Sequence, residues 1–213
     1  GATAEALRAL DSLARRFSPN AEELWLRAAI LLTMKRRGEA VSAMRQAVEL
    51  DPTRGELRAD LAGMLWLGNE KQAAIEQGIA ALVFGVEQHR ELEQVVRLLR
   101  VAGYTGAAEN VLQVRLNGRT ETAGLWFERG RTALRRDQPG DAVRYFHRSL
   151  ALFPGSPEAH YYLAVALRRS RQYEKAKEYA QRSHDLGSLR GEHWILPSAA
   201  ELAKCELLAA RAR

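Results

Sequence analysis

The chain has 213 residues, of which 46% are hydrophobic and 27% charged, so its composition is neither that of a disordered chain nor that of a membrane-spanning one. The formal net charge is +6, and 27 of the 32 basic residues are arginine, whose guanidinium suits fixed, bidentate contacts with carboxylate or phosphate. The single cysteine, Cys205, excludes an internal disulfide framework and any metal site built from several cysteines.

The N-terminal segment, GATAEALRAL, has no initiator methionine, no basic segment and no apolar leader. We interpret Gly1, with or without Ala2, as an expression scar. A first helix is predicted near Thr3 to Phe17. It lacks an earlier partner in the repeat described below, which indicates a piece of a longer protein. Residues 1–20 are therefore expected to form a half-repeat, and the sequence carries no signal that separates a cytoplasmic from a periplasmic location.

An alanine recurs every 34 residues through most of the chain, at Ala40, Ala74, Ala108, Ala142 and Ala176. A fixed period of this length is typical of repeat proteins, in which stacked units bury a core that no unit could bury alone. We therefore predict five repeats over residues 21–190, with the boundaries 21–54, 55–88, 89–122, 123–156 and 157–190.

Each repeat is predicted to contain two helices, because two stretches with a 3.6-residue hydrophobic period flank a short breaker. The breakers are Arg36-Arg37-Gly38, Gly68-Asn69, Gly103-Tyr104, Gln138-Pro139-Gly140 and Ser170-Arg171-Gln172. Alanine at position 20, facing mostly small residues at position 8, would let the paired helices approach closely.

This pattern resembles the tetratricopeptide repeat (TPR) family. The repeat from Ala123 matches best, and its matching residues at positions 4, 8, 20, 24 and 32 are Trp126, Gly130, Ala142, Phe146 and Pro154. The repeats from Gly55 and His89 match more weakly. The resemblance implies an all-α fold, a right-handed α-α superhelix (TPR solenoid).

Two positions depart from the family pattern, and the C-terminal segment leaves it. Arg27 and Arg129 stand at position 7, where the family usually has leucine, and long arginine stems can lie across apolar surface. Trp194 falls at position 4 of a sixth unit, which Pro197 interrupts. We predict a loop and a C-terminal capping helix over residues 191–213, beginning at Pro197 or Ser198, which covers the apolar end of the stack.

The resemblance also implies a groove lined by positions 2, 5, 9, 12 and 13 of each first helix, which share one helix face. In the first two repeats these positions hold no arginine and two tryptophans, Trp25 and Trp66. In the last three repeats seven of fifteen are arginine, namely Arg90, Arg97, Arg100, Arg131, Arg135, Arg168 and Arg169, and two others are Phe127 and Tyr161. The sequence therefore predicts an apolar N-terminal half and a basic C-terminal half of the groove.

Such a groove suits a protein or peptide segment with hydrophobic and acidic character, because arginine and aromatic residues supply much of the binding energy at interfaces. The alternative is structural: the arginines are solvated or paired with Glu93, Glu128 and Glu158, and the tryptophans fill gaps between helices. A clamp for a terminal carboxylate is not expected, because Trp25 and Ala29 replace the lysine and asparagine of such clamps.

Patterns of catalytic or cofactor chemistry are missing from the sequence. The five histidines lack metal-binding spacing, the glycines form no phosphate loop, and Cys205 has no histidine nearby in sequence. We predict no cofactor, no metal and no enzymatic activity. The pI of about 9.8 raises nucleic acid as a partner, but 26 interspersed acidic residues, scarce lysine and the lack of a recognised motif argue against it.

The function predicted from these features is that of a non-catalytic protein-interaction scaffold. Two alternatives stay open. The chain could be a segment of a larger bacterial assembly, such as an envelope polysaccharide-export machine, or a regulatory appendage of an enzyme.

Overall fold

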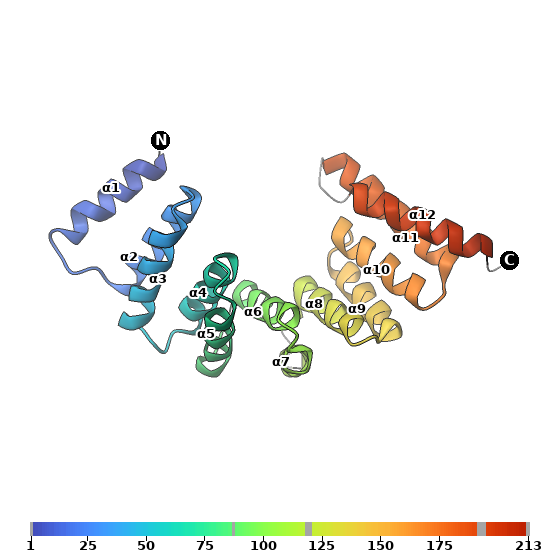
Figure 1. Cartoon of the computed structure of the whole chain (residues 1–213), viewed down its shortest axis with the longest axis horizontal. Helices are drawn as coiled ribbons and strands as arrows, with labels where there is room; N and C mark the ends of the chain where they lie inside the picture. Colours follow the sequence, from blue (N-terminus) through green and yellow to red (C-terminus); the bar gives the residue numbers. More distant parts are fainter. Residues whose placement is uncertain (1, 87, 118–120, 191–194, 212–213) are drawn as a thin grey trace. The chain divides into compact units, whose positions relative to one another are not determined.

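The computed structural model describes residues 2–86, 88–117, 121–190 and 195–211, and these residues form twelve α-helices and no strand (Figure 1). The chain divides into two compact units, residues 1–103 (the N-terminal unit) and 104–213 (the C-terminal unit). The boundary falls inside the third predicted repeat, between its first and second helices. The all-α expectation is confirmed.

The helices of the N-terminal unit are α1 (Ala2–Ala14), α2 (Ala21–Thr33), α3 (Arg37–Leu50), α4 (Gly55–Leu67), α5 (Lys71–Phe84) and α6 (His89–Val101). Helices α2 and α3 form one closely packed pair and α4 and α5 the next, while α1 packs against α2, and α6 against α4 and α5. Met44, Leu57 and Leu65 are at most 1% exposed and lie in the core of this unit.

The helices of the C-terminal unit are α7 (Thr105–Asn117), α8 (Ala123–Arg135), α9 (Pro139–Leu152), α10 (Pro157–Arg169), α11 (Tyr173–Arg190) and α12 (Ile195–Arg211). Helices α8 and α9 form one pair, α10 and α11 another, and α12 packs against α11 and α10. Helix α12 begins at Ile195 rather than at Pro197, since proline is tolerated in the first helical turn, where backbone N–H groups have no intrahelical partner. Trp194 lies outside the described residues.

Several helix starts follow from capping residues that recur in the 34-residue register. The first helices of the repeats begin at Ala21, Gly55, His89, Ala123 and Pro157, the residues at which the sequence places the repeats. Before three of them, the side chains of Asn20, Thr122 and Ser156 accept a hydrogen bond of 2.9–3.1 Å from a backbone N–H of the first turn. Arg54 and Gln88 form no such bond, and they precede the first helices of the two repeats that match the family more weakly.

The turn inside each repeat contains a residue with positive φ at the same position. These residues, with φ between 56° and 96°, are Lys35, Asn69, Gly103, Asp137 and Arg171. In the first repeat the N–H of Lys35 donates to the Leu32 carbonyl and the N–H of Arg36 to the Leu31 carbonyl, both at 2.9 Å. This pair of bonds is a Schellman motif, which satisfies the last carbonyls of the helix. Composition does not reveal it, because lysine, aspartate and arginine replace the usual glycine.

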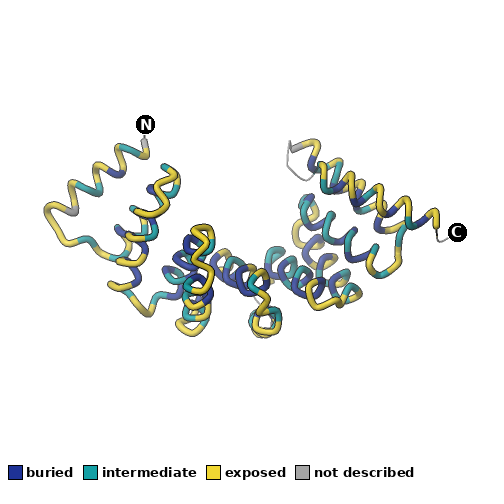
Figure 2. The backbone as a smooth tube through the Cα atoms, viewed as in Figure 1, coloured by how far each residue is buried: buried dark blue, intermediate teal, exposed yellow. Residues whose placement is uncertain are grey.

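Four alanines of the 34-residue register, Ala40, Ala74, Ala142 and Ala176, lie on the second helix of a packed pair, and the fifth, Ala108, lies on α7. Ala40, Ala74, Ala108, Ala142 and Ala176 are all 0% exposed. Ala6 stands in the same register but is exposed, and its helix α1 packs against α2. The buried residues in Figure 2 accordingly lie along the faces by which neighbouring helices pack.

The two arginines at position 7 pair with acids on the preceding helix. Arg27 of α2 donates to Asp11 of α1 at 2.5 Å, and Arg129 of α8 donates to Glu109 of α7 at 2.9 and 3.1 Å. The Arg129 guanidinium also lies 4.6 Å from the centre of the Tyr145 ring. At position 7, an ion pair between neighbouring helices therefore takes the place of the leucine contact of the family pattern.

Candidate functional site

A cavity on the first helices of the N-terminal unit brings together residues that the sequence assigns to separate halves of the groove. It has a volume of about 310 Å³, and its lining consists of Leu32, Asp60, Gly63, Met64, Trp66, Leu67, Arg90, Gln94, Arg97, Leu98 and Val101. Trp66 of α4 thus lies at the same cavity as Arg90 and Arg97 of α6. We call it the α4–α6 cavity.

The position of the Gln94 side chain between α6 and α4 depends on Gly63. A Cβ atom at this position would lie 2.2 Å from Nε2 of Gln94, which donates a 2.7 Å hydrogen bond to the Ala59 carbonyl. Because Gly63 has no side chain, Gln94 can cross from α6 to α4. The spacing of polar and apolar residues in the sequence gives no sign of this contact.

The apolar lining of the α4–α6 cavity runs from the core to the surface. Met64 and Leu98 are 9% and 5% exposed, whereas Leu67 and Val101 are 65% and 40% exposed. Trp66 is half-buried and packs against the core of the N-terminal unit. A ligand that covers the rim would therefore remove apolar surface from water.

The charged groups at this cavity are two guanidinium groups and one carboxylate. Arg90 and Arg97 are exposed. The Asp60 carboxylate accepts a 2.8 Å hydrogen bond from the indole Nε1 of Trp25. The ammonium of Lys71 lies 5.6 Å from the centre of the Trp66 ring and adds positive charge nearby. The cavity is therefore apolar with a basic rim.

Trp25 has a structural contact of its own. Its bond to Asp60 joins α2 to α4, and its half-buried ring packs against the core of the N-terminal unit. Trp25 is not among the residues that line the α4–α6 cavity. Its position fits the structural alternative for the tryptophans better than a contact with a partner.

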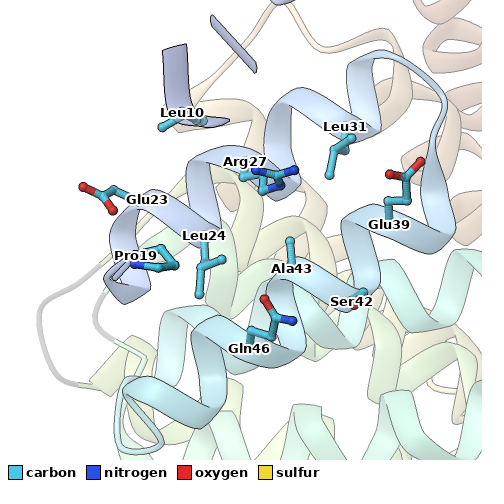
Figure 3. A pocket seen from close by; sticks show the side chains of 10 residues that line it. All are labelled: Leu10, Pro19, Glu23, Leu24, Arg27, Leu31, Glu39, Ser42, Ala43 and Gln46. Atoms are coloured by element: carbon cyan, nitrogen blue, oxygen red, sulfur yellow. The ribbon is translucent and has the colours of Figure 1, made fainter. Parts of the chain in front are cut away.

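A second cavity, of about 330 Å³, lies among α1, α2 and α3 (Figure 3). Its charged residues already have partners within the chain. Arg27 is paired with Asp11, and Glu39 is paired with Arg36. Glu23 accepts from the backbone N–H of Asn20 as part of the capping box of α2. Of these contacts, Arg27–Asp11 joins two helices and the other two are local contacts at helix N-termini, so each of the three side chains has a partner within the chain.

In the C-terminal unit, two predicted binding residues form a cluster between α8 and α10. The Arg131 guanidinium lies 4.5 Å from the centre of the Tyr162 ring and 5.6 Å from that of Phe127. Its Nη1 is 3.5 Å from Oε1 of Glu158. This is the pairing with Glu158 that the structural alternative named.

Arg168 and Arg169 join α10 to its neighbours. Nε of Arg168 donates to Oε1 of Glu201 on α12 at 2.5 Å, and the Glu201 side chain is 1% exposed. Nη1 of Arg169 donates to the Leu134 carbonyl near the end of α8 at 3.1 Å. Sequence reasoning missed Glu201, because it lies outside the repeats. The signal that could have found it is the spacing of Ser198, Glu201 and Cys205, which places the carboxylate on one face of α12 with the other two residues.

The other three predicted residues differ in exposure. Arg100 is 3% exposed, so the expectation that it lines an accessible groove is wrong. The reason is that α6 buries Leu98, Leu99 and Arg100 in succession, a wider arc than one helix face. Arg135 is exposed. Tyr161 is half-buried, its ring lies 5.1 Å from that of Tyr162, and burial raises the pKa of its hydroxyl.

Two observations on the described residues bear on catalytic chemistry. No group of three or more histidine, cysteine, aspartate or glutamate side chains among the described residues could hold a metal ion. Cys205 is buried, and burial raises the pKa of its thiol to about 11, which disfavours the nucleophilic thiolate at neutral pH. None of the described helices is both long enough and apolar enough to span a bilayer.

Helix pairs that recur every 34 residues and share a buried alanine define an α-helical repeat protein. Two family models, both for the tetratricopeptide repeat, match residues 24–54 and 127–188. These matches show that the chain contains tetratricopeptide repeats, as its residue pattern predicts. No curated protein sequence matches the chain.

Solved structures of TPR proteins share the fold. PilW, a type IV pilus biogenesis factor, aligns with a TM-score of 0.75 at 18% identity, over 91% of this chain and 89% of PilW. YrrB, described as a TPR protein with an unusual peptide-binding site, aligns at 0.66 and 18% identity, over 91% and 98% of the two chains. PilF of Pseudomonas aeruginosa aligns at 0.64 and 20% identity, over 100% and 94%. At these identities the similarity establishes the fold alone.

Proposed function

We propose that the chain is a non-catalytic protein-interaction scaffold that binds a segment of another protein through its first helices. The observation that carries this proposal is the α4–α6 cavity, whose rim residues Leu67 and Val101 stay exposed beside two arginines. Exposed apolar surface next to guanidinium groups is the composition that protein interfaces favour. The peptide-binding site attributed to YrrB supports a peptide as the kind of ligand.

The proposed partner segment has hydrophobic and acidic character. In the N-terminal unit, Arg90 and Arg97 are exposed and could reach its carboxylates. In the C-terminal unit, Arg131 and Arg168 are only 21% and 24% exposed, whereas Arg135 is exposed and is therefore the more accessible candidate there. We therefore propose fewer binding residues than the sequence pattern predicts.

The alternatives from the sequence are narrower forms of this proposal. A scaffold within a larger bacterial assembly would use the same first-helix surface, and the resemblance to PilW fits such a role without assigning it. A regulatory appendage of an enzyme would also bind through this surface. Both share the test below, because both require a bound segment.

The test is a selection of displayed random 12-residue peptides on the immobilised chain. We expect peptides that combine apolar and acidic residues to be enriched, and Arg97→Glu to weaken their binding by roughly 10-fold or more, since rim charges contribute to electrostatic complementarity. Circular dichroism verifies that the variant is folded. A selection that enriches no peptide above an unrelated helical-repeat control would contradict the proposal.

A further inference from the structure

The lining of the α4–α6 cavity points to a more specific ligand chemistry. We infer that the cavity takes one apolar side chain of a partner segment, while Arg90 and Arg97 hold a side-chain carboxylate close to it in the same segment. This inference rests on the proposed function. It departs from the sequence prediction, in which apolar and acidic parts of the partner bind to separate halves of the groove.

The volume of the cavity sets the size of the group that enters it. About 310 Å³ is at the low end of the roughly 300–1,000 Å³ typical of sites for whole small molecules. The buried side chains of Met64 and Leu98 and the exposed side chains of Leu67 and Val101 give it an apolar lining. The cavity therefore has room for one large apolar side chain, and its lining suits such a group.

The spacing of the arginines limits where the carboxylate can be. Arg90 and Arg97 are seven residues apart on α6, so they lie two turns, or about 10 Å, apart along one helix face. Gln94 of the cavity lining lies between them in sequence. A carboxylate that reaches either arginine must therefore lie within about four residues of the anchored side chain, since an extended chain advances about 3.3 Å per residue.

The charges at the cavity favour an anion. Among the residues that the structure describes, none forms an ion pair with Arg90. Asp60 is the one carboxylate of the lining, and the Trp25 indole already donates to it at 2.8 Å. Guanidinium groups bind carboxylates with two parallel hydrogen bonds, which a lysine cannot do.

The other charged clusters of the chain lack this combination. The cavity among α1, α2 and α3 is lined by the carboxylates of Glu23 and Glu39 as well as by Arg27. In the C-terminal unit, the side chains of Arg131 and Arg168 are only 21% and 24% exposed. The α4–α6 cavity differs because apolar rim residues and exposed arginines meet there.

The probe for the test is a set of fluorescein-labelled, C-terminally amidated 12-residue peptides in an alanine–serine background. Each carries one leucine, phenylalanine or tryptophan, and one glutamate placed one to eight residues away; a matched peptide carries glutamine instead. Binding to the full chain is measured by fluorescence polarisation. We expect glutamate within four residues of the anchor to strengthen binding roughly 10-fold over glutamine, and this preference to disappear at larger separations.

Two variants locate the contacts. The double variant Arg90→Gln/Arg97→Gln should lose the preference for glutamate but keep weak binding through the apolar anchor. Leu67→Asp should weaken all peptides, because it places a charge at the apolar rim. Arg136→Gln, at an exposed arginine of the C-terminal unit to which no binding role is assigned, is the matched control and should keep the preference. All four substituted residues are exposed, so the variants should remain folded, which circular dichroism verifies.

The outcomes separate this inference from the proposed function. Peptides that bind without a glutamate preference, or whose preference survives Arg90→Gln/Arg97→Gln, overturn the inference and leave the scaffold function standing. A preference seen only in peptides with a free C-terminus overturns the assignment to a side-chain carboxylate. Absence of binding by every peptide, together with a random selection that enriches none, overturns both.

Discussion

Arg129 and Glu109 join α8 to α7 through two hydrogen bonds to one carboxylate oxygen, at 2.9 and 3.1 Å, and their side chains are only 14% and 16% exposed. Arg27 and Asp11 join α2 to α1 at the same repeat position. Arginine at position 7 is therefore compatible with the fold when the preceding helix supplies an acid within reach.

Glu109→Ala should lower the free energy of unfolding by about 2–3 kcal/mol, less than the roughly 3–5 kcal/mol for a fully buried pair, because both side chains keep some contact with water. The loss arises because Arg129 is left without its carboxylate partner. Urea unfolding followed by circular dichroism measures it. Glu39→Ala, which removes the exposed partner of Arg36, is the control and should leave stability unchanged. Equal effects in the two variants would contradict the prediction.

Ala142→Leu should destabilise the chain by about 1–3 kcal/mol, because position 20 is fully buried between paired helices and has no room for three more carbon atoms. The matched control is Ala6→Leu, which changes the same repeat position where it is exposed. Thermal unfolding of the two variants should show a lower midpoint only for Ala142→Leu. A comparable drop for Ala6→Leu would show that helix contacts do not explain the alanine register.

Arg171→Gly should raise stability by about 0.5–1 kcal/mol, because Arg171 has φ of 60°, a conformation that glycine adopts without a steric penalty. Asn69→Gly, at the equivalent turn, should gain less, since asparagine tolerates positive φ better than arginine does. The urea concentrations at the unfolding midpoints of the parent and the two variants measure these changes in stability. A loss of stability in Arg171→Gly would contradict the prediction. It would mean that the Arg171 side chain stabilises the fold by more than the positive-φ conformation of its backbone destabilises it.

Glu201→Gln should weaken the docking of α12, because a hydrogen bond to a charged group contributes about 1.5–3 kcal/mol and Arg168 loses its charged partner. The measurement is the rate at which a maleimide labels Cys205 in each folded variant, divided by the rate at which it labels the same variant unfolded in urea. Cys205 is 0% exposed, so labelling reports opening of this helix. We expect roughly 10-fold faster labelling. Glu206→Gln, which breaks an exposed pair, should label at the parent rate.

His160 should make stability fall on acidification. Burial lowers the pKa of His160 below its ordinary value of 6.5, although a hydrogen bond to the Pro154 carbonyl opposes the shift. The unfolded chain therefore binds this proton more readily, so the stabilisation is complete above pH 6.5 and is lost as pH falls from there toward the lower pKa of the folded state. Unfolding free energies at pH 8 and pH 5.5 should differ less in His160→Gln than in the parent. His89→Gln, at an exposed histidine, should keep the parental difference.

The sequence by itself determined where the first helices of the five repeats begin and that the alanine at position 20 of each repeat is buried. The first helices begin at the residues that the 34-residue period marks, because caps, breakers and small residues act over one or two helical turns. Ala108 is buried as fully as Ala142, although its repeat matches the family weakly. Local chemistry repeated at a fixed interval is sufficient for this level of structure.

The tertiary structure decided which arginines are exposed. Arg97 and Arg131 have equivalent positions in the sequence pattern, yet Arg97 is exposed at the α4–α6 cavity, whereas Arg131, beside Tyr162 and Glu158 of the next first helix, is only 21% exposed. The sequence could not separate them, since burial and pairing depend on residues about 30 positions away that helix stacking brings within a few ångströms. The periodicity of a helix specifies which way a side chain points, but only the neighbouring helices specify what it meets.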